Sequence, residues 1–321
     1  MSDLQIVIYI IGGSAGLFIG AESLVRGSSS LALRFGISPL IVGLTVVAFA
    51  TSSPELVVSI KAAIEGNSGI VVGNVVGSNI CNIGLILGIA ALISPMRVKT
   101  QLVKREIPIL IGVSLILFFV LLTGSVSRII GVFFVIGIIF YIVLGYMYAI
   151  QEKNEQTAIK EFEDGIPKKP YSFPFSIILI IVGLGLLVLG SNLFVDGAVA
   201  AANKLGVSDA VIGLTVVALG TSLPELITSI VASIKNENDI AIGNAVGSNV
   251  FNILSILGIS SIIHPITNSG ITIIDLSIMM AFTIVIFPLC RTDFSLKRWE
   301  GAFLFAGYAA YIIYIASSQV T

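Results

Sequence analysis

Two glutamates lie inside strongly apolar segments, and each directly follows a proline with hydroxyl-bearing residues just before it. The segments read VVAFATSSPELVVSIK from Val46 and VVALGTSLPELITSIV from Val216. Their polar side chains are Thr51, Ser52 and Glu55 in the first copy and Thr221, Ser222 and Glu225 in the second. A charged side chain at the centre of a bilayer costs roughly 2.5–3.5 kcal/mol by insertion scales. Because this unfavourable arrangement occurs twice, the sequence indicates one functional site built from both copies.

The prolines add backbone ligands, since they interrupt the hydrogen bonds of a helix. Pro54 and Pro224 have no N–H to donate to the carbonyl four residues earlier, which leaves backbone oxygens free nearby. We expect carbonyls around Ala48 and Ala218 to join the hydroxyls and carboxylates as hard oxygen ligands. Such ligands suit Na⁺ or Ca²⁺ and not soft metals. The alternative interpretation is a proline kink whose Thr/Ser pair packs against a neighbouring helix.

A second duplicated motif follows each kinked segment and reads GNVVGSNICNIGLILG in the first copy and GNAVGSNVFNILSILG in the second. Residues four apart lie along one side of a helix. The resulting stripes consist of Asn74, Ser78 and Asn82 in the first copy and Asn244, Ser248 and Asn252 in the second. They are either ion ligands or contacts between helices, and the second interpretation applies most readily to Asn74 and Asn244. Asn79 and Asn249 point about 100° away from the adjacent serines and are weaker candidates.

The elements that position these motifs are membrane spans. The 321-residue chain is 56% hydrophobic and only 11% charged, whereas a soluble domain is about a quarter charged. We predict an all-α membrane protein of ten transmembrane helices, embedded in a lipid bilayer. The predicted spans are 4–24, 38–62, 70–93, 106–124, 127–150, 174–195, 210–234, 241–263, 271–290 and 300–317. A net charge of −1 offers no basic field for nucleic acid, and nothing in the sequence indicates a cofactor or an oligomeric state.

The motif pairs belong to a longer internal duplication. An offset of 170 residues maps Gly16–Gly88 onto the second half without a gap. Each half has an odd number of spans, so the second half must enter the membrane from the opposite side, a plan common in secondary transporters. We expect two inverted five-helix repeats at 1–150 and 174–321, joined by a polar linker at 151–173.

Orientation follows from the positively charged residues. Most Lys and Arg residues fall on one side of the membrane if the N-terminus is placed outside. We therefore expect a multi-pass protein of the cell membrane with both termini outside and the linker 151–173 in the cytoplasm. Outside the motifs, Glu22 and Arg26 have the spacing of a structural ion pair, and Glu106 and Asp275 resemble charges at helix starts.

Charge narrows the choice of substrate. Two carboxylates neutralise one Ca²⁺, or two of several Na⁺ ions. No Lys or Arg lies near the middle of the four motif-bearing spans, which argues against an anionic substrate. Because Na⁺ and Ca²⁺ are close in size, the same oxygens could hold either ion in turn. Competition for shared ligands is what an antiporter with two substrates requires.

With these motifs the sequence resembles the calcium/cation antiporter superfamily and, within it, the prokaryotic sodium/calcium exchangers. The doubled G-T-S-x-P-E and G-N-x-x-G-S-N signatures carry the resemblance, which covers almost the whole chain. It implies Na⁺/Ca²⁺ antiport by alternating access, in which the first and sixth spans slide over the core. The implied ion ligands are Ala48, Thr51, Ser52, Glu55, Ser78, Asn82, Ala218, Thr221, Ser222, Glu225, Ser248 and Asn252.

Two departures from the family pattern bear on function. Many members carry Asp where this chain has Asn252, so the site here has two carboxylates and potassium co-transport is weakened. Ala50 stands where the motif usually has Gly, and its methyl group could crowd the first kink.

Three other functions are compatible with buried carboxylates. A H⁺/Ca²⁺ exchanger is the alternative within transporters, because buried glutamates can carry protons. A channel could use the carboxylates as a ring. An intramembrane hydrolase is disfavoured because the two glutamates have identical neighbourhoods, whereas acid and base roles need different ones. We therefore expect a transporter and not an enzyme.

Overall fold

The computed structural model describes residues 1–154, 170–205, 220–267 and 270–318, and these residues are almost entirely helical. The first half contains α1 (Asp3–Phe35), α2 (Pro39–Val42), η1 (Gly43–Val47), α3 (Ala48–Thr51), α4 (Ser53–Ile64), α5 (Ser68–Cys81), η2 (Asn82–Leu87), α6 (Gly88–Ile93), η3 (Leu102–Glu106), α7 (Ile107–Leu122) and α8 (Arg128–Asn154). The second half contains α10 (Phe173–Lys204), α13 (Leu223–Ile234), α14 (Asn238–Phe251), η5 (Asn252–Leu257), α15 (Gly258–Ile263), α16 (Ile273–Arg291), η6 (Thr292–Phe294) and α17 (Arg298–Ser318).

The described helices make this a multi-pass membrane protein. Seven of them are long and apolar enough to cross a bilayer, and the number is eight if the bent pair Pro39–Thr51 and Ser53–Ile64 is counted as one broken span. Most of the predicted linker, and the first part of the predicted span 210–234, lie outside the described residues.

α1 and α10 are longer than the predicted spans 4–24 and 174–195. They have 33 and 32 residues, or about 50 Å of helix against a hydrocarbon layer of about 30 Å. The apolar stretches of the sequence indicate only the part of each helix that lies inside the hydrocarbon layer, and both helices continue beyond that layer. α1 is fixed at its start by a capping box at Ser2 and at its end by Gly36 in the left-handed region, with φ of 63°.

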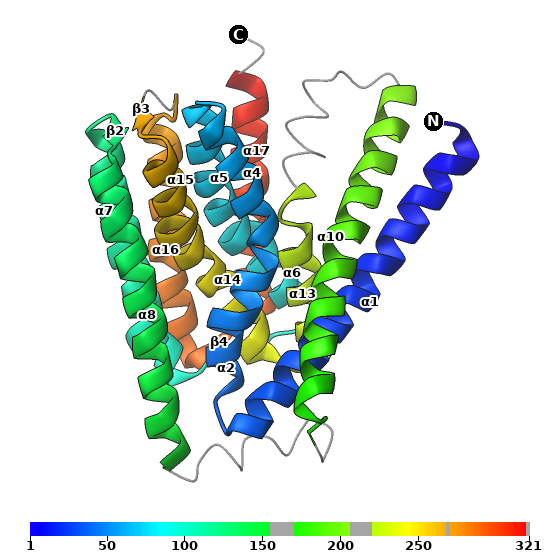
Figure 1. Cartoon of the computed structure of the whole chain (residues 1–321), viewed down its shortest axis with the longest axis vertical. Helices are drawn as coiled ribbons and strands as arrows, with labels where there is room; N and C mark the ends of the chain where they lie inside the picture. Colours follow the sequence, from blue (N-terminus) through cyan, green and yellow to red (C-terminus); the bar gives the residue numbers. More distant parts are fainter. Residues whose placement is uncertain (155–169, 206–219, 268–269, 319–321) are drawn as a thin grey trace.

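The two long helices run side by side and antiparallel at the right of Figure 1. Glycines let their backbones touch. A Cβ added to Gly20 would lie 2.8 Å from the carbonyl oxygen of Gly183, and one added to Gly190 would lie 2.7 Å from the backbone nitrogen of Leu17. α1 and α10 therefore form one tightly packed pair beside the remaining helices.

The motif-bearing helices occupy the centre of the molecule. The continuous helical stretches Ser68–Ile93 and Asn238–Ile263 have 78% and 83% of their apolar windows buried, against 22–28% for α1, α8 and α10. α7 and α8 stand at the opposite side of Figure 1 from the α1–α10 pair. The second duplicated motif therefore lies on the two most buried of these seven spans.

Two short strand pairs connect the halves. β1 (Met96–Arg97) pairs antiparallel with β4 (Ser295–Leu296), and β2 (Ser125–Val126) pairs antiparallel with β3 (Ile266–Thr267). Figure 1 shows β2 and β3 at one end of the bundle and β4 toward the other. Each end of the molecule is thus tied by one strand from each half.

Candidate cation-binding site

Both glutamates lie in the first turn of a helix that starts after a break. α3 ends at Thr51, and the chain bends by 46° at Ser52 before it continues as α4. Pro54 occupies the start of α4, where its missing N–H is tolerated, and Glu55 follows it. Ser222 has nearly the same backbone conformation before α13, which begins with Leu223, Pro224 and Glu225. The break buries each carboxylate in the protein interior, where only 1% of either residue is exposed.

The two halves exchange hydrogen bonds at the carboxylates. The Ser52 hydroxyl donates to Oε1 of Glu225 at 3.0 Å, and the Ser222 hydroxyl donates to Oε1 of Glu55 at 3.2 Å. Each glutamate is therefore held by the serine of the other half. This reciprocity brings four of the predicted site residues, from α3–α4 and α13, into one group.

The first asparagine of each stripe braces the broken helix. Asn74 donates from Nδ2 to the backbone oxygen of Glu55 at 3.1 Å, and Asn244 donates to that of Glu225 at 3.3 Å. Asn244 also accepts at Oδ1 from the Thr51 hydroxyl at 3.0 Å. Their contacts match the interpretation of these two asparagines as links between helices.

The last asparagine of each stripe begins a π-helical segment. η2 starts at Asn82 and η5 at Asn252, and such wide turns occur frequently at functional sites. The amide of Asn82 donates to Oδ1 of Asn249 at 2.9 Å, and the amide of Asn252 donates to Oδ1 of Asn79 at 3.1 Å. The contacts of Asn79 and Asn249 were missed from the sequence, although their exact duplication beside each stripe was a signal.

Several buried oxygens at this group have no hydrogen-bond partner within the described part of the chain. They are Oε2 of Glu55, Oε2 of Glu225, Oδ1 of Asn82, Oδ1 of Asn252 and Oγ of Ser248. A buried polar atom without a partner costs about 1–3 kcal/mol. Four of these five are carboxylate or amide oxygens, which only accept. A desolvated cation would satisfy all of them, whereas an anion would be repelled.

The remaining predicted ligands are placed as follows. The Ala48 carbonyl accepts from the backbone N–H of Ser52 at 3.0 Å. The Thr51 hydroxyl shares its one hydrogen between Asn244 Oδ1 and the Val47 carbonyl oxygen, which lies 3.1 Å away. Ser78 is buried on α5, while Thr221 is half-buried directly before Ser222. Ala218 lies outside the described residues.

Comparison with known proteins identifies the family. Residues 5–147 and 175–316 match the family model described as sodium/calcium exchanger protein. The chain belongs to the sodium/calcium exchanger family. It is 37% identical to the putative antiporter CaxA of Alkalimonas amylolytica over 319 residues, covering 98% of this chain and 100% of that one. It is 32% identical to the sodium/calcium exchanger MaX1 of Methanosarcina acetivorans over 340 residues, covering 95% and 97%.

A solved structure has the same fold. The sodium/calcium exchanger from Methanococcus jannaschii superposes with a TM-score of 0.83 at 32% identity, covering 97% of this chain and 98% of that one. These relatives of the exchanger family are transporters and not enzymes. The predicted resemblance is therefore confirmed.

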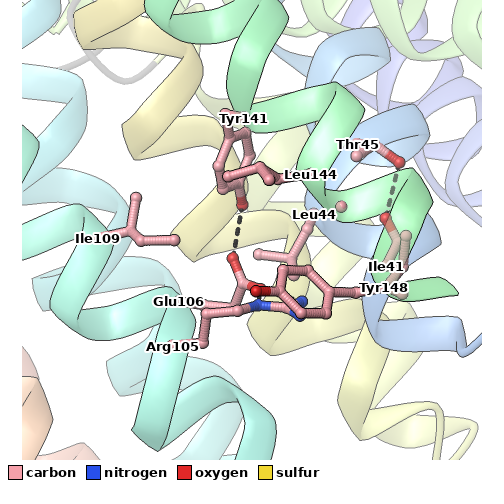
Figure 2. Close-up of a pocket in the computed structure, with 10 residues that line it drawn as sticks. Ile41, Leu44, Thr45, Arg105, Glu106, Ile109, Tyr141, Leu144 and Tyr148 are labelled. Carbon is pink, nitrogen blue, oxygen red and sulfur yellow. Dashed lines mark hydrogen bonds and ion pairs between the residues drawn. The ribbon is translucent and has the colours of Figure 1, made fainter. Parts of the chain in front are cut away.

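This family member carries a second polar group away from the central site, shown in Figure 2. Glu106 is buried, with Arg105 Nη2 at 2.5 Å and the Tyr141 hydroxyl donating to it at 3.0 Å. In the other half the Tyr311 hydroxyl donates to Asp275 at 3.1 Å. Asp275 does cap the start of α16 as predicted, but Glu106 lies in η3 with its charge compensated, so it is not simply a charge at a helix start.

A third charged group joins α1 to the turn between α13 and α14. The predicted pair of Glu22 and Arg26 is present at 2.5 Å, and Lys235 joins it at 2.8 Å from Glu22. In the same turn, burial raises the pKa of the Glu237 carboxyl to about 7. The nearby Ser29 hydroxyl and Lys235 act against this rise, while the Asp239 carboxylate adds to it.

Proposed function

We propose that this protein exchanges Na⁺ for Ca²⁺ across the membrane by alternating access, with both ions using one site around Glu55 and Glu225. The observation that carries the proposal is the set of unpartnered acceptor oxygens on Glu55, Glu225, Asn82 and Asn252. Membership of the sodium/calcium exchanger family supports the same two substrates.

The chemistry of the donors favours these ions over others. Ca²⁺ takes six to eight oxygen ligands in a flexible arrangement, whereas Mg²⁺ rarely uses a cage made only of protein groups. Carboxylate, amide and hydroxyl oxygens from both halves supply such a set. The two carboxylates balance one divalent ion, and Na⁺ can occupy the same oxygens when Ca²⁺ leaves. We assign the predicted ligands Ala48, Thr51, Ser52, Ser78, Ala218, Thr221, Ser222 and Ser248 to the same site.

The proposal includes an architecture of ten transmembrane helices in two inverted five-helix repeats, 1–150 and 174–321, with a linker at 151–173. The offset of 170 residues that relates the motifs also maps β1 onto β3 and β2 onto β4. Reciprocal bonds at the glutamates add to this support. Two halves of opposite orientation would present equivalent states of one central site to the two sides of the membrane.

We place the protein in the cell membrane with both termini outside and the linker 151–173 in the cytoplasm. The positive-inside rule supports this orientation. Arg97, Lys99 and Arg298 lie near the end of the bundle where β1 meets β4, and this end would face the cytoplasm.

The test is calcium-45 uptake by proteoliposomes loaded with Na⁺ and diluted into Na⁺-free buffer. We expect uptake that stops when Na⁺ is equal on both sides. Liposomes containing the Glu55→Gln/Glu225→Gln double variant serve as the matched control. Uptake that follows a pH gradient and ignores Na⁺ would replace this proposal with H⁺/Ca²⁺ exchange. No uptake under either gradient would overturn calcium antiport.

A further inference from the structure

We propose that Asn79 and Asn249 are positioning residues that turn the amides of Asn82 and Asn252 so that their oxygens face the cation. This proposal rests on the proposed function, because it concerns the ligands of the same site. It assigns a role to two residues that lie off the stripes and whose side chains bond to stripe amides of the other half.

The need for positioning comes from the chemistry of the amide group. An asparagine side chain ends in an oxygen that accepts and an NH₂ that donates, and the two ends have nearly the same shape. With Oδ1 toward a cation the side chain is a ligand, but with Nδ2 toward it the side chain repels the ion. A carboxylate has no such problem because both of its ends are oxygens.

One chain of hydrogen bonds fixes the amide of Asn82 completely. Asn249 donates from Nδ2 to the backbone oxygen of Asn79 at 3.3 Å, and a backbone carbonyl can only accept. Oδ1 of Asn249 must therefore point the other way, where it accepts from Nδ2 of Asn82 at 2.9 Å. This leaves Oδ1 of Asn82 as the end without a partner among the described residues. Each orientation in this chain follows from the one before it.

The second half repeats part of this arrangement with the roles exchanged, although Nδ2 of Asn79 has no hydrogen-bond partner among the described residues. Nδ2 of Asn252 donates to Oδ1 of Asn79 at 3.1 Å, and Oδ1 of Asn252 is the unpartnered end. Asn79 lies in α5 and orients a residue of η5, whereas Asn249 lies in α14 and orients the first residue of η2. Each half therefore sets the ligand of the other half. All four side chains are at most 1% exposed.

The experiment first removes the positioning side chain of Asn249. It then replaces the asparagine ligand with an aspartate, which needs no positioning. Leucine has the same number and branching of side-chain atoms as asparagine, so Asn249→Leu deletes the hydrogen bonds with a small change in shape. We expect about a tenfold rise in the calcium concentration for half-maximal exchange. Asn82→Asp puts a carboxylate at the ligand position, where orientation no longer matters. In that background, Asn249→Leu is expected to raise the half-maximal concentration less than about threefold.

The matched control combines each leucine variant with the aspartate at the asparagine that it does not orient. Asn252→Asp adds the same charge to the site, but Asn249 does not orient that residue, so it should leave the full effect of Asn249→Leu in place. Conversely, Asn79→Leu should be rescued by Asn252→Asp and not by Asn82→Asp. This second pair keeps the test decisive if Asn249→Leu fails to fold, which a melting curve of each purified variant will show.

The outcomes separate the two proposals. Rescue by the paired aspartate and not by the crossed one supports positioning. Equal losses in all backgrounds, or no loss in any, would make Asn79 and Asn249 packing residues and would leave the proposed antiport intact. A wild-type protein that exchanges no calcium would overturn the proposed function, and the positioning role with it.

Discussion

Glu55 and Glu225 are each buried with one carboxylate oxygen bonded to a serine of the other half and the second oxygen unpartnered within the described chain. A neutral pair of serine bonds does not compensate a full charge in a membrane interior. In the proposed antiport, the residual negative charge of the two side chains would select a cation and set its valence.

We predict that Glu55→Gln and Glu225→Gln each lower calcium exchange at least about tenfold, equivalent to about 1.4 kcal/mol. Glutamine keeps the shape and one oxygen, but a single remaining carboxylate does not neutralise a dehydrated divalent ion. The measurement is calcium-45 exchange at saturating calcium. Glu65→Gln, which changes an exposed glutamate at the end of α4, is the control. Near wild-type rates in either site variant would remove that glutamate from the site.

Potassium provides a second prediction at the level of single residues. Asn82 and Asn252 carry no charge, so the site has no third carboxylate to balance an additional monovalent cation. We expect exchange to persist within about twofold when K⁺ is replaced by choline on both sides. A strict requirement for K⁺ in the wild-type protein would show that the two amides do not determine this property.

The broken helices differ between the halves at one matched position. Gly220 stands where the first half has Ala50, four residues before each proline. Gly220 is close to α10: its carbonyl accepts from the Ser191 hydroxyl at 2.6 Å, and an added Cβ would lie 2.7 Å from Cγ2 of Val195. The second break is therefore packed against α10 at a place where an added methyl group would require the Val195 side chain to shift.

We predict that Gly220→Ala changes the sodium concentration for half-maximal exchange on one face of the membrane by roughly threefold. Ala50→Gly, which relieves the first break, should reduce the difference between the faces while calcium exchange continues. The measurement is calcium flux in oriented vesicles with Na⁺ titrated on each side in turn. Gly185→Ala is the control, because nothing lies within 4 Å of its added Cβ. Unchanged sodium dependence in both test variants would mean that the difference is neutral packing.

The turn between α13 and α14 carries a prediction about pH. Burial raises the pKa of Glu237 to about 7, so between its ordinary pKa and this value the carboxyl is protonated in the folded protein and ionised in the unfolded chain. Folding stability therefore falls as pH rises through this window. Glutamine at this position stays neutral throughout. We expect the melting temperature of Glu237→Gln, relative to wild type, to increase by roughly 2 °C between about pH 6 and pH 8. Parallel melting curves would contradict this assignment.

At the scale of the whole molecule, much of the candidate site was predictable because its motifs occur in both halves of the sequence. A proline, a glutamate and a stripe of asparagines at matched places in two halves indicated which residues meet. The amide contacts of Asn79 and Asn249 were not predictable in this way, since helical periodicity shows which side a residue faces and not which helix stands there. The full lengths of α1 and α10 were not predicted, because the apolar stretch of each sequence ends at the edge of the hydrocarbon layer while the helix continues into the polar region.

Orientation is the prediction that concerns the molecule as a whole. We expect Ser2→Cys to react with a membrane-impermeant maleimide on intact cells, and Asp293→Cys to react only after permeabilisation. Both positions are exposed, whereas the natural Cys81 and Cys290 are buried. Labelling of Asp293→Cys on intact cells would reverse the proposed topology.

The reciprocal bonds between Ser52 and Glu225 and between Ser222 and Glu55 have a consequence for ancestry. Contacts in which two partners exchange identical roles are those of a two-fold symmetric dimer. A five-helix ancestor with one copy of each motif would complete the same group of oxygens by pairing with a second copy inserted upside down. Fusion of two such genes would then allow each copy to diverge, which fits the difference between Ala50 and Gly220.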